Sequence, residues 1–192
     1  LMSKIFRSRR DDGITEEELV GMVEQARTEG GLDEHEGDLI RNAIEFNDLE
    51  VSEILTPRVD LVAAEEGSTM EEVASLFVES GYSRIPIYHE TIDNIVGVVH
   101  EKDFYAARYR GETMLSHLKS PVFYTTGNTK ISELLRILQK NKAHMAIVVD
   151  EYGGTEGIAT LEDILEELVG EIWDEHDEVI EIFQKQPDGS YL

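Results

Sequence analysis

The sequence predicts an α/β protein built from two β-α-β-β-α repeats, related by a pseudo-two-fold axis and preceded by two helices. The main observation is internal similarity, because residues 157–164 (GIATLEDI) align with residues 97–104 (GVVHEKDF), 60 positions earlier. In both segments a short apolar strand leads directly into a helix. Since each repeat is too small to be stable alone, the two are expected to share one core and to leave a cleft between them.

The first 50 residues are predicted to form a basic tail and a helical connector. Thr15 with Glu18 is a capping box that begins a helix, which Gly30 and Gly31 end. Asp33 with Glu36 begins a second helix, whose apolar positions form one stripe that needs a partner surface. These positions are Leu39, Ile40, Ala43, Ile44 and Phe46.

The two repeats are predicted at residues 51–112 and 113–175. In the first, Ser68 and Glu71 are expected to cap a helix that Gly81 ends. Its other elements are an extended stretch to residue 62, strands at 85–88 and 95–99, and a closing helix at 103–109. The second is expected to contain a helix at 129–139, strands at 145–149 and 156–159, and a last helix at 161–169.

Composition limits the classes of function. The 192 residues include 41 acidic and 17 basic side chains, a net charge of −24. This charge argues against nucleic acid as a partner, because phosphate binding needs a cationic surface. Cysteine is absent, which excludes disulfides and thiolate metal sites.

No stretch approaches the roughly 20 apolar residues that a membrane span needs, so the sequence is expected to be a soluble piece of a longer protein. The basic cluster at residues 4–10 suits the chain just after a membrane helix, and it also suits an ordinary tail. Residues 176–192 are interpreted as an acidic linker and the truncated start of another domain, because the strand pattern at 179–183 and the turn at 187–190 lack a second strand.

Several motifs together resemble the CorC/CorB/CNNM family, the hemolysin-like magnesium and cobalt transport proteins. They are ILTPR at 54–58, GYSRIPIY at 81–88, VVDEYGG at 148–154 and ATLEDILEELVGEI at 159–172. The repeat itself resembles a tandem CBS-domain pair, or Bateman module. The resemblance implies a regulatory module on the cytoplasmic face of the membrane that binds an adenine nucleotide between its repeats. It also implies a homodimer and an attached transmembrane transport domain that lies outside these residues.

The predicted nucleotide site combines residues from both repeats. By resemblance, Thr160 and Asp163 bind the ribose, since a carboxylate accepts hydrogen bonds from a diol. Arg84 suits a phosphate because its guanidinium binds anionic oxygens bidentately. The predicted residues are Thr56, Tyr82, Ser83, Arg84, Pro86, Ala146, Ile147, Thr160 and Asp163. The predicted ligand is ATP or another adenine nucleotide with Mg²⁺, and one working site is expected because His100 stands where the second repeat has Thr160.

Each assignment has a structural alternative. Thr160 and Asp163 also form a capping box that needs no ligand, and Arg84 also suits a surface salt bridge. Ala146 and Ile147 also suit a plain core. A ligand-free dimerisation or docking module therefore remains the second hypothesis. The acidic run at 171–178 around His176 suggests weak cation binding or, as a third class, a metal-dependent hydrolase, but no catalytic motif accompanies it and the chain is not expected to be an enzyme.

Overall fold

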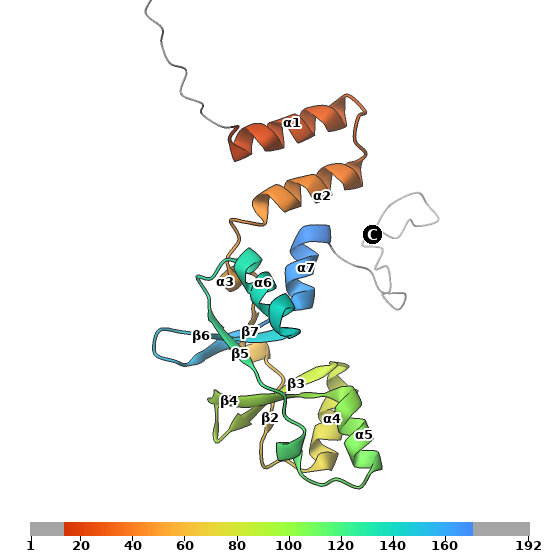
Figure 1. Ribbon diagram of the computed structural model, residues 1–192, viewed down its shortest axis with the longest axis vertical. Helices are drawn as coiled ribbons and strands as arrows, with labels where there is room; N and C mark the ends of the chain where they lie inside the picture. Colours follow the sequence, from red (N-terminus) through yellow and green to blue (C-terminus); the bar gives the residue numbers. More distant parts are fainter. Residues whose placement is uncertain (1–13, 171–192) are drawn as a thin grey trace, which may run out of the picture.

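Two antiparallel helices lead into the repeats in the computed structural model, which describes residues 14–170 (Figure 1). Helices α1 (Glu16–Thr28) and α2 (Glu34–Glu45) begin at the two predicted capping boxes. The amide of Glu18 donates to Thr15 Oγ1 over 3.2 Å, and the amide of Glu36 donates to Asp33 Oδ1 over 2.8 Å. The basic cluster at residues 4–10 lies outside the described residues. So do the acidic run, the strand and the turn that were predicted after residue 170.

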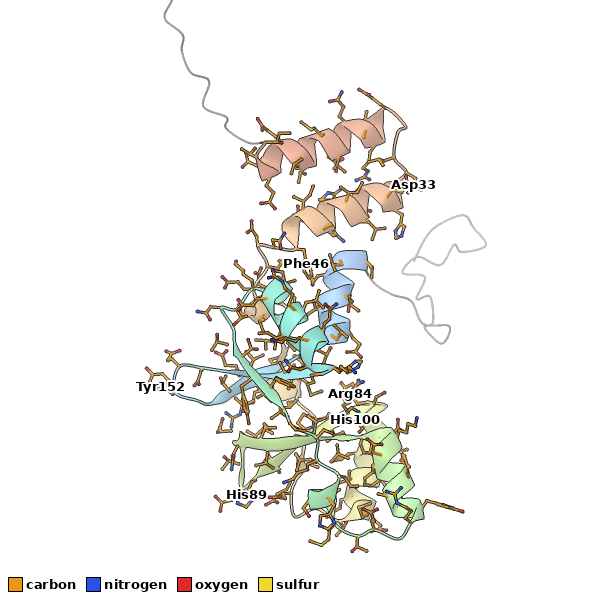
Figure 2. The ribbon with its side chains drawn as sticks, in the orientation of Figure 1. Asp33, Phe46, Arg84, His89, His100 and Tyr152 are labelled. Carbon is orange, nitrogen blue, oxygen red and sulfur yellow. The ribbon has the colours of Figure 1, made fainter. Side chains whose placement is uncertain are left out.

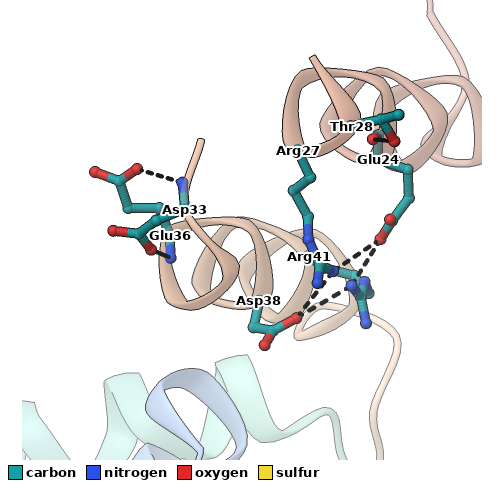
Figure 3. Close-up of polar contacts among 7 residues, drawn as sticks. All are labelled: Glu24, Arg27, Thr28, Asp33, Glu36, Asp38 and Arg41. Carbon is teal, nitrogen blue, oxygen red and sulfur yellow. Dashed lines mark hydrogen bonds and ion pairs between the residues drawn. The ribbon is translucent and has the colours of Figure 1, made fainter. Parts of the chain in front are cut away.

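An ion-pair network joins the two helices (Figure 3). Arg41 Nη2 on α2 lies 2.7 Å from Glu24 Oε1 on α1. Arg27 Nη1 on α1 lies 3.3 Å from Asp38 Oδ1 on α2. Gly37 lets the helices approach, because a Cβ there would meet Arg27 Cδ at 2.3 Å. Of the predicted apolar stripe, only Phe46 is buried, and it packs into the core of the second repeat. Ile40 of the same stripe stays 40% exposed.

The β-α-β-β-α prediction is confirmed for both repeats. The first contains β2 (Ala64–Glu65), α4 (Met70–Ser80), β3 (Arg84–His89), β4 (Thr91–His100) and α5 (Glu101–Tyr109). The second contains β5 (Phe123–Thr126), α6 (Ile131–Asn141), β6 (Met145–Val149), β7 (Thr155–Thr160) and α7 (Leu161–Val169). Each pair of helices covers one face of its sheet (Figure 1).

Two local predictions in the first repeat were wrong. Helix α4 is capped by Thr69 with Glu72, one residue after the predicted pair, since the Thr69 backbone is extended and the Glu72 amide donates to Thr69 Oγ1. The stretch to residue 62 is not a continuous strand. It holds the short β1 (Thr56–Pro57), a 3₁₀ turn η1 (Arg58–Asp60) and then irregular backbone.

The repeats exchange their leading segments. β1 belongs to the start of the first repeat, yet it pairs antiparallel with β7 of the second, so that the sheet order is β1-β7-β6-β5. Likewise, Ser120 near the start of the second repeat bridges to Val98 in β4 of the first. Short helix α3 (Val51–Ile54) also packs on the second repeat, through the fully buried Val51. The exchange places the backbone from Thr56 onward across the junction of the two repeats.

Three apolar clusters follow from the alternation of side chains along the strands. Ile85, Ile87 and Val99 face helices α4 and α5, while Ala146 and Ala159 face helices α6 and α7. The opposite faces of the two sheets meet in a third cluster, which contains Ile95, Val98, Met145, Ile147 and Ile158. The two sheets therefore stack face to face, and this shared core ends at a cleft.

Candidate functional site

A cavity of about 430 Å³ lies between the repeats, where the C-terminal end of β7 meets the start of β3. This volume is within the usual range for small-molecule sites. Its floor is apolar and includes Leu61, Pro86, Met145 and Ile158, and polar side chains surround it. The complete lining is Thr56, Asp60, Leu61, Val62, Gly81, Tyr82, Ser83, Arg84, Pro86, His144, Met145, Ile158, Thr160, Glu162 and Asp163.

One wall of the cavity is the N-terminus of α7. Thr160 is the helix N-cap, and its Oγ1 accepts from the Asp163 amide over 3.2 Å. Asp163 Oδ2 accepts from the Thr160 amide over 2.8 Å, which completes the capping box. Among residues 14–170, Asp163 Oδ1 has no hydrogen-bond donor, so it is free to accept from a ligand. Thr160 and Asp163 therefore do form the capping box that was the structural alternative. This capping box leaves one carboxylate oxygen of Asp163 for binding.

The opposite wall comes from the first repeat. Gly81 adopts a left-handed conformation (φ 69°) that ends α4 and turns the chain into β3. Tyr82, Ser83 and Arg84 follow this turn and line the cavity. Because side chains alternate along β3, Arg84 and Pro86 face the second repeat while Ile85 between them is buried in its own helix-covered core.

The leading segment forms the third wall, and a charged clamp holds it there. Arg58 donates to both carboxylate oxygens of Asp93 over 2.5 and 2.9 Å, and the Thr155 amide donates to Asp93 Oδ1 over 2.9 Å. The hydrogen bonds from Arg58, and then that from Thr155, hold the pKa of Asp93 below its usual value. This clamp joins η1 and β4 of the first repeat to β7 of the second repeat.

Seven of the predicted residues, all except Ala146 and Ile147, line the cavity. Both exceptions are fully buried and do not line it. Ala146 faces the helices, and Ile147 lies deeper between the two sheets. Met145, the residue before Ala146 in β6, lines the cavity instead.

The sequence interpretation missed Asp60, His144 and Glu162 among the polar lining residues. His144 could have been found from the repeat, because it occupies the position of Ser83 in the first copy. The His144 carbonyl accepts from the Leu161 amide, as the Ser83 carbonyl accepts from the Glu101 amide. A repeat alignment that allows one extra residue in the first copy, between Ser83 and Glu101, would have found this equivalence of Ser83 and His144.

Three basic side chains, Arg84, His100 and His144, lie close together where the repeats meet. Arg84 is paired with His100 across β3 and β4, and Figure 2 places both labelled side chains between the repeats. Burial lowers the pKa of His100 below its ordinary 6.5, and the charges of Arg84 and His144 lower it further, while Asp103 partly opposes this. Arg84 Nη1 lies 3.4 Å from Glu162 Oε1, as the salt-bridge alternative proposed.

The lowered pKa of His100 predicts an effect on stability. Well above pH 6.5 the imidazole is neutral in folded and unfolded chains, so it contributes no pH dependence there. As the pH falls below this value, the unfolded chain takes up the proton first, and the folded state loses stability. We expect the His100→Gln variant to lose less free energy of unfolding than the parent between pH 7.5 and pH 5, measured by urea denaturation. The exposed His35→Gln is the control, and identical losses in parent and His100→Gln would contradict the prediction.

The described residues show neither a membrane span nor a metal cluster. In the range 14–170, no helix combines the length and the apolar character that crossing a bilayer requires. Over the same residues, no three side chains of the histidine, cysteine or carboxylate type are arranged to hold a metal ion.

Comparison with known proteins identifies the family. The model of the CBS domain matches residues 51–110 and again 115–170. Hemolysin C of Brachyspira hyodysenteriae is 40% identical over 161 residues, which are 84% of this chain and 60% of that protein. The chain covers as little as 28% of the length of other curated relatives.

Solved structures agree with this match. The CBS domain of a bacterial CNNM/CorC family Mg²⁺ transporter is 40% identical, with a TM-score of 0.76 over 84% of this chain and 100% of that one. A structure of such a CBS domain in complex with ATP is 43% identical, with a TM-score of 0.65 over 70% of this chain and 97% of that one. With two matched repeats and these neighbours, the chain belongs to the CBS-domain family, as a tandem CBS pair of the CorC/CNNM group.

Proposed function

We propose that this CBS pair binds an adenine nucleotide, as MgATP, in the cavity between its repeats and thereby regulates a magnesium or cobalt transporter. The observation that carries the proposal is the joint lining of one cavity by Thr160 and Asp163 from the second repeat and by Ser83 and Arg84 from the first. A ligand that contacts both walls stabilises one arrangement of the repeats. This change in arrangement is how binding would affect an attached domain.

Each part of a nucleotide has a suitable counterpart. The free Asp163 Oδ1 suits the ribose diol, and the apolar floor around Pro86, Met145 and Ile158 suits a purine ring. Arg84 and the N-terminus of α7 provide positive potential for phosphate. The related CBS domain that was solved in complex with ATP supports the same ligand class.

Magnesium is proposed as a co-ligand because the cavity is poor in positive charge. Arg84 and His144 share the lining with the carboxyl groups of Asp60, Glu162 and Asp163. The whole chain carries −24, so free ATP is repelled. Mg²⁺ neutralises phosphate oxygens while keeping most of its water, and needs no dedicated protein ligands.

The expected result is that ATP binds more tightly with Mg²⁺ than in EDTA. AMP, with less charge, should show a smaller effect of Mg²⁺, and added salt should relieve part of the penalty for metal-free ATP. Isothermal titration calorimetry of each nucleotide under both conditions measures this. An ATP affinity that EDTA leaves unchanged would contradict the role of magnesium.

Two other functions are tested alongside. A ligand-free dimerisation or docking module would show no heat with ATP, ADP, AMP or S-adenosylmethionine. A metal-dependent hydrolase would release phosphate from ATP, which a phosphate assay detects. The homodimer, the attached transmembrane domain and the cytoplasmic position belong to the proposal, and light scattering with and without MgATP tests the dimer.

A further inference from the structure

Glu162 is the acidic neighbour of Arg84 and His144 in the cavity. It is the second residue of α7, and its side chain crosses from the second repeat toward the first. Its Oε1 lies 3.4 Å from Arg84 Nη1 and 3.7 Å from His144 Nδ1. One carboxylate oxygen therefore lies beside both basic side chains of the lining, Arg84 and His144.

These contacts leave Arg84 and His144 incompletely hydrogen-bonded. Arg84 Nε and His144 Nδ1 are inaccessible to solvent and, within residues 14–170, have no hydrogen-bond acceptor. The 3.7 Å separation from His144 is too long for a hydrogen bond, and 3.4 Å from Arg84 is a weak one. The Arg84 side chain is 21% exposed, whereas that of Glu162 is 62% exposed. Arg84 is thus the more buried partner, while the mostly exposed Glu162 can turn toward solvent at little cost.

We infer that Glu162 is an internal competitor for the phosphate position: without a ligand its carboxylate pairs with Arg84, beside His144, and a nucleotide phosphate displaces it. This inference rests on the proposed nucleotide site. A carboxylate and a phosphate are both anions that accept from the same guanidinium, and they repel each other at short range. Binding therefore requires Glu162 to leave, and the residue sets the affinity below what Arg84 alone would provide.

The charge around Arg84 supports this arrangement. The field of Arg84 reaches His100, where it contributes to the lowered pKa. Glu162 is the acidic side chain paired with Arg84 in the described range, so its departure leaves the arginine free for a new anion. Its role differs from that of Asp163, whose carboxylate is held in the capping box.

The test compares Glu162→Gln with Glu166→Gln. Glu166 lies one turn further along α7, is exposed and does not line the cavity, so it controls for removal of one charge and for changes in helix stability. Removing the competing charge should tighten binding of MgATP and AMP by about five- to tenfold in Glu162→Gln. Glu166→Gln should bind as the parent does. Adenosine, which lacks phosphate, should bind all three proteins equally.

Calorimetry with these three ligands distinguishes the outcomes. If Glu162→Gln binds MgATP as well as or less well than the parent, Glu162 does not compete and the inference is wrong. An equal gain in affinity in Glu166→Gln also overturns the inference, because the effect then comes from the net charge of the chain. An equal gain for adenosine overturns it as well, because the effect is then not at the phosphate. If neither parent nor variants bind any nucleotide while both stay folded by circular dichroism, the proposed function itself fails.

Discussion

Replacing Asp163 with asparagine is expected to weaken nucleotide binding by about 10- to 150-fold, the equivalent of roughly 1.5–3 kcal/mol for a hydrogen bond to a charged group. The side-chain amide oxygen of the introduced asparagine can still accept from the Thr160 amide, as Asp163 Oδ2 does over 2.8 Å, so the helix cap is kept. The free carboxylate oxygen that faces the cavity is lost. The effect should therefore appear in binding and not in folding.

Calorimetry with MgATP measures the affinity, and thermal unfolding without nucleotide confirms the fold. The matched control is Asp103→Asn, at the equivalent position 60 residues earlier. Asp103 does not line the described cavity, and its helix has no side-chain N-cap bond from His100. Full affinity in Asp163→Asn together with a loss in Asp103→Asn would move the site to the pseudo-symmetric position.

A second large effect is expected from Gly157→Ala. A Cβ at this position would lie 2.1 Å from the Thr56 carbonyl oxygen and 2.8 Å from Leu55 Cδ1. Thr56 and Pro57 form β1, which pairs with Ile158 and Gly157 of β7, so the added methyl group forces the strands apart. The backbone oxygen cannot move aside as a flexible side chain would. We expect a loss of about 2–3 kcal/mol in the free energy of unfolding.

The same substitution should also weaken MgATP binding, because Thr56 lines the cavity. Urea denaturation measures stability, and calorimetry at a temperature where the variant is folded measures binding. Gly67→Ala is the control, since Gly67 is exposed and a Cβ there meets no atom within 4 Å. Its stability should change by less than about 0.5 kcal/mol. Equal stability of the two variants would contradict the close approach of β1 to β7.

Local sequence signals predicted the elements well where the reason for each element is local. Thr15, Asp33 and Thr160 each begin a helix through a bond to a residue three positions later, and that spacing is visible in the sequence. The Ser68 prediction failed by one residue because Thr69 and Glu72 offer the same spacing. Only the backbone conformation distinguishes two overlapping capping boxes.

Predicted site residues line the cavity where the repeat and the strand alternation both applied, and their role in binding stays a prediction. Arg84 and Pro86 were found because they follow a glycine helix stop and share one face of a strand. Ala146 and Ile147 were predicted as nucleotide-binding residues, but neither lines the cavity, because Ala146 packs against the helices and Ile147 between the two sheets. His144 and Glu162 were missed because a histidine before a strand and a glutamate in a helix have no distinctive pattern of their own.

The sequence by itself determined the duplicated β-α-β-β-α order and the family, because both depend on residues close together in the chain. Only the tertiary structure decided that β1 pairs with β7 and that Arg84 lies beside Glu162, 78 positions later. Strand pairing and ion pairing between distant segments depend on which apolar faces pack together. The shared core of Ile95, Met145 and Ile158 brings the two repeats into contact, and this packing places residues from both on one cavity.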